Sequence, residues 1–235
     1  MSGGSSGDTG RTAASAPGTP PRRRIVMVDD DTLIREGAAA RMPDVDVLPA
    51  VSVEEVLACG ARFAPVDVVV VDLRLRQPGA PPVGVQGARG VAALAAAGYP
   101  TLIYTNEHRR HVLAMCLAAG ARGIVHKTEP VSRLRAAVDA VVAGRVVLTP
   151  AVAGLAELVA RAGRLPALTD RQREVLRARA RGEPFASIAR RLFISERTAE
   201  DHMSAVATKF AELLRGRSAA DLERELGVGE GDLLD

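Results

Sequence analysis

The stretch VDVVVVDLRL, residues 66–75, joins a run of β-branched residues to an aspartate, Asp72, directly at its end. Branched apolar side chains on both faces of a strand are typical of a parallel sheet that is buried on both sides. In open sheets of this kind, ligands bind beyond the carboxyl ends of the strands. The stretch therefore predicts a buried central strand with a carboxylate at the edge where sites form.

Similar short apolar runs lie on either side of this strand along the chain, at 25–28, 45–48, 101–104 and 123–126. Helix candidates separate the runs, near 32–42, 53–62, 87–97, 108–119 and 131–143. Strands that alternate with helices favour a parallel sheet covered by helices on both faces. The predicted fold is a doubly wound, flavodoxin-like α/β domain with a five-stranded parallel sheet.

The alternation stops after Gly144 and gives way to a helical pattern. Thr149 is a candidate N-cap followed by Pro150 at the first helical position, which predicts a linker helix. Further helices are expected near 169–181, 184–192, 196–211 and 218–226, and they form a small all-α domain. The expected organisation is a disordered tail at 1–21, an α/β domain at 22–145, a linker at 146–164, a helical domain at 165–228 and a tail at 229–235.

The composition is typical of a soluble globular protein, with 47% apolar and 25% charged residues in a chain of 235. No apolar run reaches the roughly 18 residues of a membrane span, and the start has no signal-peptide pattern, so we expect a cytoplasmic protein without membrane contact. Residues 25–145 are balanced in charge, whereas 161–226 hold 14 basic and 10 acidic residues. The basic C-terminal part is where a nucleic acid is expected to bind. Cys59 and Cys116 are expected to be buried thiols.

Polar residues follow four of the five predicted strands. Asp29, Asp30 and Asp31 come after the first strand, Asp72 after the third, Thr105 after the fourth and Lys127 after the fifth. Clustered carboxylates repel one another unless a hard cation such as Mg²⁺ lies among them. A carboxylate beside that cation can attack a phosphoryl group, while a hydroxyl and an ammonium hold the phosphoryl oxygens. Asp31 is expected instead to cap the helix that follows it.

The motifs VDDD (28–31), VDLRL (71–75), YTN (104–106) and VHK (125–127) resemble, in this order, the receiver domain of two-component response regulators. The resemblance implies that Asp72 is the phosphoacceptor and that a sensor histidine kinase is the phosphodonor. It further implies that Mg²⁺ is bound by Asp30 directly, by Asp29 through water, and by Asp72 and the backbone carbonyl of Arg74. Thr105 and Lys127 would complete the catalytic set.

Three features differ from the family pattern near this set. Arg76 replaces a usual proline, Ile124 replaces a usual aromatic residue, and the loop 76–89 is longer than is typical. The acidic, hydroxyl and ammonium residues are intact, so these differences concern how phosphorylation is controlled.

The segment LTDRQREVLRARARGEPFASIARRLFISERTAEDHMSAVATKF, residues 168–210, resembles the LuxR/NarL-type helix-turn-helix. The resemblance implies a scaffold helix at 185–192, a recognition helix at 196–211 with Ser195 as its N-cap, and binding of double-stranded DNA as a homodimer. Base edges would face Glu200, Asp201 and Ser204. Phosphate contacts or helix support would come from Arg190, Arg191, Arg197, Thr198, His202 and Lys209.

Glu200 and Asp201 are unusual on a surface that meets a polyanion. One interpretation is that they accept hydrogen bonds from cytosine N4 in the major groove. Another is that they only favour the helix dipole at the N-terminus of the recognition helix.

Together these patterns predict a DNA-binding response regulator, and not an enzyme, in which phosphorylation of Asp72 controls sequence-specific DNA binding. One alternative is a receiver that works without phosphorylation, as an interaction or ligand-sensing module. Another is an antagonist that pairs with a related regulator and binds DNA poorly. A phosphatase with Asp72 as nucleophile is disfavoured, because no second acid is evident for general acid catalysis.

Overall fold

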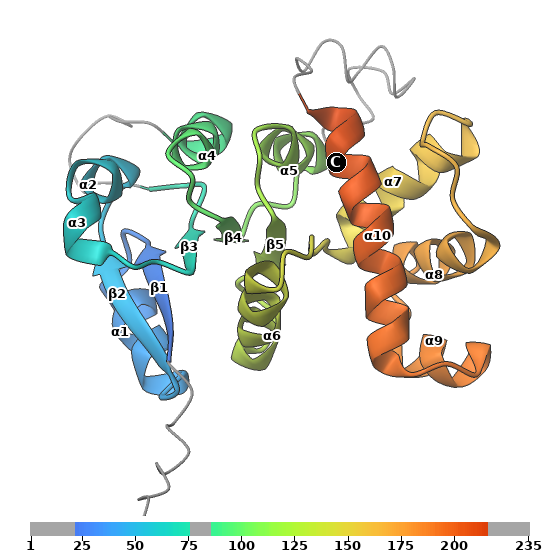
Figure 1. Ribbon diagram of the computed structural model, residues 1–235, viewed down its shortest axis with the longest axis horizontal. Coiled ribbons are helices and arrows are strands. Elements are labelled where there is room, and N and C mark those ends of the chain that lie inside the picture. The colour runs from blue at the N-terminus through green and yellow to red at the C-terminus, as the bar shows by residue number, and fades with distance from the viewer. Residues whose placement is uncertain (1–21, 76–85, 216–235) are drawn as a thin grey trace, which may run out of the picture.

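In a computed structural model, residues 22–75 and 86–215 form a parallel sheet with helices on both faces, followed by a bundle of four helices (Figure 1). The sheet has the strand order β2-β1-β3-β4-β5 and every neighbouring pair is parallel. Its strands are β1 (Arg23–Val28), β2 (Val45–Ala50), β3 (Val68–Val71), β4 (Thr101–Thr105) and β5 (Gly123–His126). The predicted flavodoxin-like doubly wound fold is therefore confirmed.

Helices cover both faces of this sheet. On one face lie α1 (Thr32–Arg41) and α6 (Val131–Val142), and on the other lie α2 (Val53–Ala58), α3 (Gly60–Phe63), α4 (Gly87–Ala96) and α5 (Arg110–Ala118) (Figure 1). The single helix expected at 53–62 is two short helices that meet at Cys59. Because the chain turns there, the Cys59 thiol is exposed and the prediction that it is buried is wrong, whereas Cys116 is buried as predicted.

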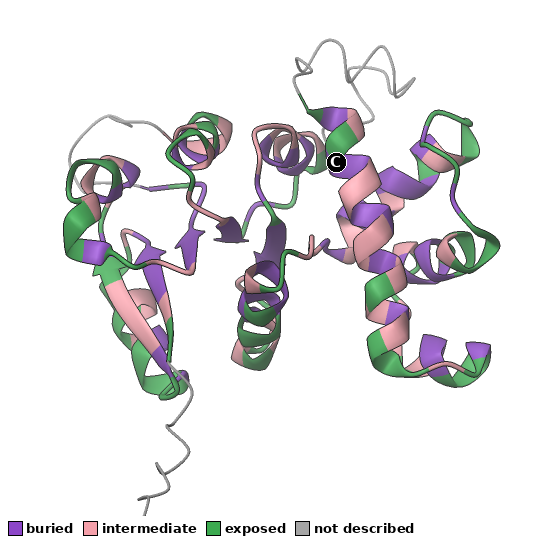
Figure 2. Cartoon of the chain, in the orientation of Figure 1, coloured by how far each residue is buried: buried purple, intermediate pink, exposed green. Residues whose placement is uncertain are grey.

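Alternate residues of the strands pack on opposite faces, as the strand geometry requires. Ile25, Met27 and Val70 pack towards α1 and α6 in one apolar cluster. Val26, Val69 and Ile103 pack towards α2, α4 and α5 in a second cluster, which continues without a break into the C-terminal helices. Figure 2 shows β3, β4 and β5 buried, the edge strand β2 largely half-buried, and the outer helix faces exposed. The two halves of the chain thus share one core.

The helices of the C-terminal half begin where the sequence indicated. They are α7 (Pro150–Arg161), α8 (Asp170–Ala180), α9 (Phe185–Leu192) and α10 (Glu196–Leu214). Thr149 caps α7 through the backbone N–H of Val152, and Thr169 with Gln172 forms a capping box on α8. Helix α7 packs mainly on α8, and α10 packs on α8, α9 and the receiver-side helix α5.

Some expectations fall outside the described residues. The helix predicted at 218–226 and the tails at 1–21 and 229–235 cannot be compared with the structure, and the same holds for Arg76 and most of the loop 76–89. Helix α10 runs to Leu214, three residues beyond the expected end. Within residues 22–75 and 86–215, none of the helices has the length and apolar character needed to cross a membrane.

The chain that leaves α6 adds to the outer edge of β5. The backbone N–H of Ile124 donates to the carbonyl of Val147 at 3.0 Å, and the N–H of Val147 donates to the carbonyl of Arg122 at 3.0 Å. A side chain at Gly123 would meet Leu102 Cδ1 at 2.7 Å and Val147 Cβ at 3.2 Å, so this close approach requires glycine. The bridge fixes Arg145 and Val146 beside helix α10.

Candidate functional site

Two of the predicted catalytic residues, Asp72 and Lys127, and the predicted metal ligand Asp29 meet at the carboxyl edge of the sheet. Asp29 follows β1, Asp72 follows β3 and Lys127 follows β5. The ammonium Nζ of Lys127 lies 2.8 Å from Asp29 Oδ2 and 2.7 Å from Asp72 Oδ2. All three side chains are nearly buried, with exposed fractions of 1% for Asp29, 9% for Asp72 and 11% for Lys127. Two carboxylates and one ammonium therefore share a small enclosed site.

The acidic residues fit a divalent cation. Asp29, Asp30 and Asp72 each offer one carboxylate oxygen, and these oxygens lie within 4.8 Å of one another. Asp29 Oδ2 is buried and has no hydrogen-bond partner within the described residues, although it is in ion-pair range of Lys127. Burial raises the pKa of Asp29, because removal from water penalises its charged form. Three carboxylates carry more negative charge than the single ammonium of Lys127 balances, and a hard cation with oxygen ligands would offset the rest.

Lys127 retains its charge despite burial. Burial opposes protonation, but hydrogen bonds to Asp29 and Asp72 outweigh it and raise the pKa of Lys127. Lys127 therefore presents a fixed positive charge at the site across the physiological range.

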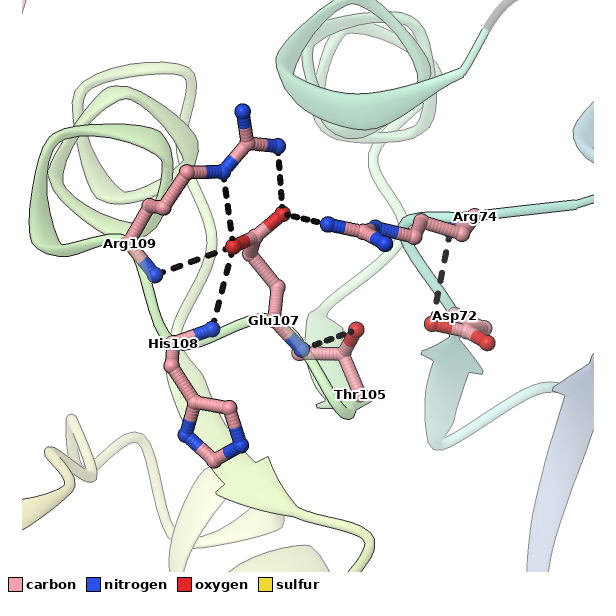
Figure 3. A network of polar contacts seen from close by, with 6 residues as sticks. All are labelled: Asp72, Arg74, Thr105, Glu107, His108 and Arg109. Atoms are coloured by element: carbon pink, nitrogen blue, oxygen red, sulfur yellow. Dashed lines mark hydrogen bonds and ion pairs between the residues drawn. The ribbon is translucent and has the colours of Figure 1, made fainter. Parts of the chain in front are cut away.

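Thr105 lies at the end of β4 and is completely buried. Its Oγ1 accepts a hydrogen bond from the backbone N–H of Glu107 at 3.2 Å (Figure 3). Arg74, also predicted near the cation, donates its backbone N–H to Asp72 Oδ1 at 3.4 Å. The structure thus places every residue of the predicted phosphorylation site on neighbouring strand ends.

Glu107 was not singled out from the sequence, yet it is the centre of a polar network beside the site. Its carboxylate is 3% exposed and pairs with Arg74 at 2.9 Å and with Arg109 at 2.7 Å (Figure 3). Oε1 also accepts the backbone N–H groups of His108 and Arg109. The side chain of Arg109 is the largest of several causes that hold the pKa of Glu107 well below its usual range. The sequence signal that could have indicated Glu107 is its position two residues after the end of β4, where site residues gather.

The helix-turn-helix has the predicted core and caps. Ile188, Leu192, Ala199 and Met203 are buried, and Ser195 accepts the backbone N–H of Thr198 at 2.9 Å. Between α9 and α10 the chain turns at Phe193, which has φ of 55° and is 96% exposed. A left-handed conformation is costly for an aromatic residue, so the turn geometry outweighs this local preference.

The basic candidates for DNA contact occupy two kinds of position. Arg190, Arg191 and Arg197 are exposed, although Arg191 pairs with Glu183 at 2.9 Å. Lys209 points inward, and its Nζ donates to the carbonyl of Ala167 at 2.6 Å and to Gln172 Oε1 at 3.2 Å. Lys209 therefore supports the packing of α10 on the segment before α8. Thr198 and His202 are half-buried.

The face of α10 that carries the candidate base-contacting residues Glu200, Asp201 and Ser204 is contacted and partly covered by the α/β half. Arg145 Nη1 lies 3.5 Å from Asp201 Oδ1 and 3.7 Å from Glu200 Oε2. The backbone N–H of Val146 donates to Ser204 Oγ at 3.2 Å. Glu200 and Ser204 are therefore partly covered, contrary to expectation, whereas Asp201 is exposed as expected. Nothing local in the sequence indicated Arg145, because the contact depends on the bridge to β5.

A buried carboxylate–lysine site on a flavodoxin-like sheet, joined to a helix-turn-helix, defines the class of response regulators. Comparison with known proteins supports this class. The family model described as "Bacterial regulatory proteins, luxR family" matches residues 166–212. The DNA-binding transcriptional activator DevR/DosR of Mycobacterium tuberculosis is 30% identical over 220 residues, which cover 88% of this chain and 99% of that protein. The chain belongs to the NarL/LuxR-type response regulators.

Two further proteins show the extent of the likeness. A probable transcriptional regulatory protein NarL of M. tuberculosis is 28% identical over 214 residues, covering 88% of this chain and 96% of that protein. RcsB of Salmonella enterica serovar Typhimurium, solved bound to a promoter in the presence of the phosphomimetic BeF3⁻, has a TM-score of 0.50 and 20% identity, covering 88% of this chain and 98% of that one. The RcsB likeness concerns the fold.

Proposed function

We propose that the protein is a transcription regulator whose DNA binding is controlled by phosphorylation of Asp72. The observation that carries the proposal is the site of Asp29, Asp72 and Lys127, in a chain whose recognition helix is contacted by the half that holds this site. A covalent change at the sheet edge can shift such a two-part protein between arrangements.

In the phosphorylation step, a carboxylate oxygen of Asp72 attacks the phosphorus of a phosphohistidine on a sensor kinase. The new O–P bond forms as the P–N bond breaks, and the histidine nitrogen leaves with the electron pair. Lys127, 2.7 Å from Asp72, holds a phosphoryl oxygen, and Thr105 binds another as the chain rearranges. Asp29, Asp30, Asp72 and the backbone carbonyl of Arg74 would hold Mg²⁺, which would supply positive charge to the phosphoryl oxygens.

The DNA-binding surface consists of α9 and the first turns of α10. Phosphates meet Arg190, Arg191, Arg197, Thr198 and His202, while Lys209 supports the helix through its hydrogen bond to the carbonyl of Ala167. Ser204, Glu200 and Asp201 face base edges once they are uncovered, where a carboxylate can accept from cytosine N4. Two copies bind DNA as a homodimer.

The unphosphorylated form is a closed one, because Arg145 and Val146 occupy the face of α10 that would enter the major groove. Strand β5 links the two sites: Lys127 follows its carboxyl end and Gly123, at its start, is bridged to Val147. Movement of Lys127 towards a phosphoryl group would be transmitted along β5 to this bridge. The α/β half would then release the recognition helix.

The phosphorylation step is tested by incubating the full-length protein with a small acyl phosphate and measuring the mass increase of one phosphoryl group. We expect labelling that requires Mg²⁺ and is lost in Asp72→Asn. It should persist in Asp46→Asn, the matched control, because Asp46 lies near the start of β2 and pairs with Arg24. Labelling that survives in Asp72→Asn would overturn the assignment of the phosphoacceptor.

A further inference from the structure

A cavity of about 250 Å³ lies between the two halves of the chain, away from the phosphorylation site. Its walls come from β5 and α6 of the α/β half, from the segment 145–148, and from α9 and α10 of the helical half. Cavities at interfaces between domains are common positions for small-molecule sites. A ligand held by both halves would bind only while they are together.

Most of the lining is apolar. Ile124, Ala137 and Leu148 are buried on the side of the α/β half, and Met203 is buried on the side of α10. Phe185, at the start of α9, lines the same cavity, and the guanidinium of Arg133 lies 5.6 Å from the centre of its ring. These walls match a small apolar body, such as an aromatic ring.

The unmet polar group in the lining is a hydrogen-bond donor. Arg145 lines the cavity with a side chain that is 18% exposed. Its contacts with Asp201 and Glu200, at 3.5 and 3.7 Å, are ion pairs too long to be good hydrogen bonds. Because these long contacts leave the guanidinium without a short acceptor, an incoming carboxylate would be favoured.

The acidic residues of the lining already have cationic partners. Glu129 pairs with Arg133, Asp139 pairs with Arg23, and Glu200 lies beside Arg145. A cationic ligand would have to displace these arginines, whereas an anionic ligand meets a guanidinium that still has a free donor. The chemistry of the cavity therefore selects an anion with an apolar body.

We propose that this cavity binds a small aromatic carboxylate, with its carboxylate on Arg145 and its ring against the apolar lining beside Phe185. Because the site is built from both halves, binding stabilises the closed form and lowers DNA affinity by linkage. Binding itself stands independently of the proposed function, and only its effect on DNA affinity rests on that function.

Benzoate is the probe, and its binding to the full-length, unphosphorylated protein is measured by saturation-transfer NMR titration. A ligand with about nine non-hydrogen atoms is expected to bind with a Kd of about 1 mM. Benzamide, which has the same shape but no charge, should bind at least about tenfold more weakly. Absence of saturable benzoate binding up to about 10 mM, or equal binding of benzamide, would overturn the proposal.

Variants locate the site. Arg145→Gln removes the charged donor and should weaken benzoate binding about tenfold or more. Arg135→Gln is the matched control, since Arg135 is on α6, does not line the cavity, and pairs with Asp44. Ala140→Leu fills the cavity from α6 and should also abolish binding, with circular dichroism to establish that it folds. Unchanged affinity in Arg145→Gln would exclude this site.

A last experiment distinguishes failure of the ligand site from failure of the proposed phosphorylation switch. Asp72→Asn cannot be phosphorylated, so benzoate should bind it as it binds the unmodified protein. Loss of binding in Asp72→Asn would contradict a separate cavity. Treatment of the unmodified protein with Mg²⁺ and an acyl phosphate should weaken benzoate binding, and failure of that step alone would count against the proposed switch and not against the ligand site.

Discussion

Glu200 and Asp201 face Arg145 in the closed form, which gives these carboxylates a role apart from DNA. The sequence left open whether they read cytosine or only favour the helix dipole. The structure adds a third role, because the two side chains form ion pairs that hold the recognition helix against the α/β half. In the proposed function, both carboxylates would reach base edges once Arg145 withdraws.

The first prediction concerns Arg145. Replacement of Arg145 by Ala removes two partly exposed ion pairs, worth together about 1 kcal/mol, so the closed form loses that stability. DNA affinity of the unphosphorylated protein should rise up to about fivefold, as measured by fluorescence anisotropy on duplex DNA at fixed salt. Arg135→Ala is the control with an equal change in net charge. A gain of the same size in both variants would show that net charge, and not release of α10, is responsible.

A second prediction concerns Glu107. Its lowered pKa means that the charged carboxylate favours the folded state, so its stabilisation is present above the ordinary glutamate pKa of 4.5 and is lost as the pH falls below that value. Glu107→Gln should reduce the free energy of unfolding by about 1–3 kcal/mol at neutral pH. The deficit should shrink towards about pH 3, as followed by denaturant unfolding. A deficit that is independent of pH would contradict this account.

Among the residues of the site, those that chemistry alone requires were predictable. Asp29, Asp72 and Lys127 directly follow strands and Thr105 ends one, and parallel strands bring their carboxyl ends to one edge. Arg145 was not predictable, because its partners lie 55 or more positions away and depend on how α10 packs on α5. Contacts of this kind follow from tertiary packing and leave no local pattern in the sequence.

At the scale of elements, the apolar runs and the caps predicted most boundaries within a few residues. Asp31, Thr149 and Ser195 cap the helices that the sequence assigned to them. The prediction of a single helix at 53–62 was wrong because the apolar pattern continues across Cys59, where the chain divides into α2 and α3. Helix α10 is longer than predicted because the buried side chains of Phe210 and Leu214 extend its packed face.

The bridge between β5 and the segment after α6 gives the third prediction. Gly123→Ala places a methyl group 2.7 Å from Leu102 Cδ1 and 3.2 Å from Val147 Cβ, so the segment that carries Arg145 must shift. Overpacking of this kind should cost about 1–3 kcal/mol of unfolding free energy and should also raise DNA affinity, because the contact with α10 is disturbed.

Gly154→Ala is the matched control for that experiment. Gly154 lies within α7, and a methyl group there meets nothing within 4 Å, so the substitution should stabilise the helix by about 0.5–1 kcal/mol. Equal thermal midpoints for the two variants would show that the bridge at Gly123 is not tightly packed.

At the scale of the whole molecule, the two halves form one arrangement through a shared apolar core and a few polar contacts. The core cluster runs from β3 and α5 into α7, α8 and α10. The polar contacts between the halves involve Arg145, Val146 and Arg133, which lies over the ring of Phe185. Partly exposed ion pairs are individually weak, so the shared apolar packing contributes most to holding the halves together, and a phosphoryl group at Asp72 has to shift that packing.

The central claim is that phosphorylation of Asp72 separates the recognition helix from the α/β half, and the distance between the halves tests it directly. Dyes on the exposed Cys59 and on a cysteine introduced by Arg190→Cys would report this distance by Förster transfer. With Mg²⁺ and an acyl phosphate, transfer efficiency should fall in the unmodified background and stay constant in Asp72→Asn. Phosphorylated protein with unchanged transfer efficiency would contradict the account.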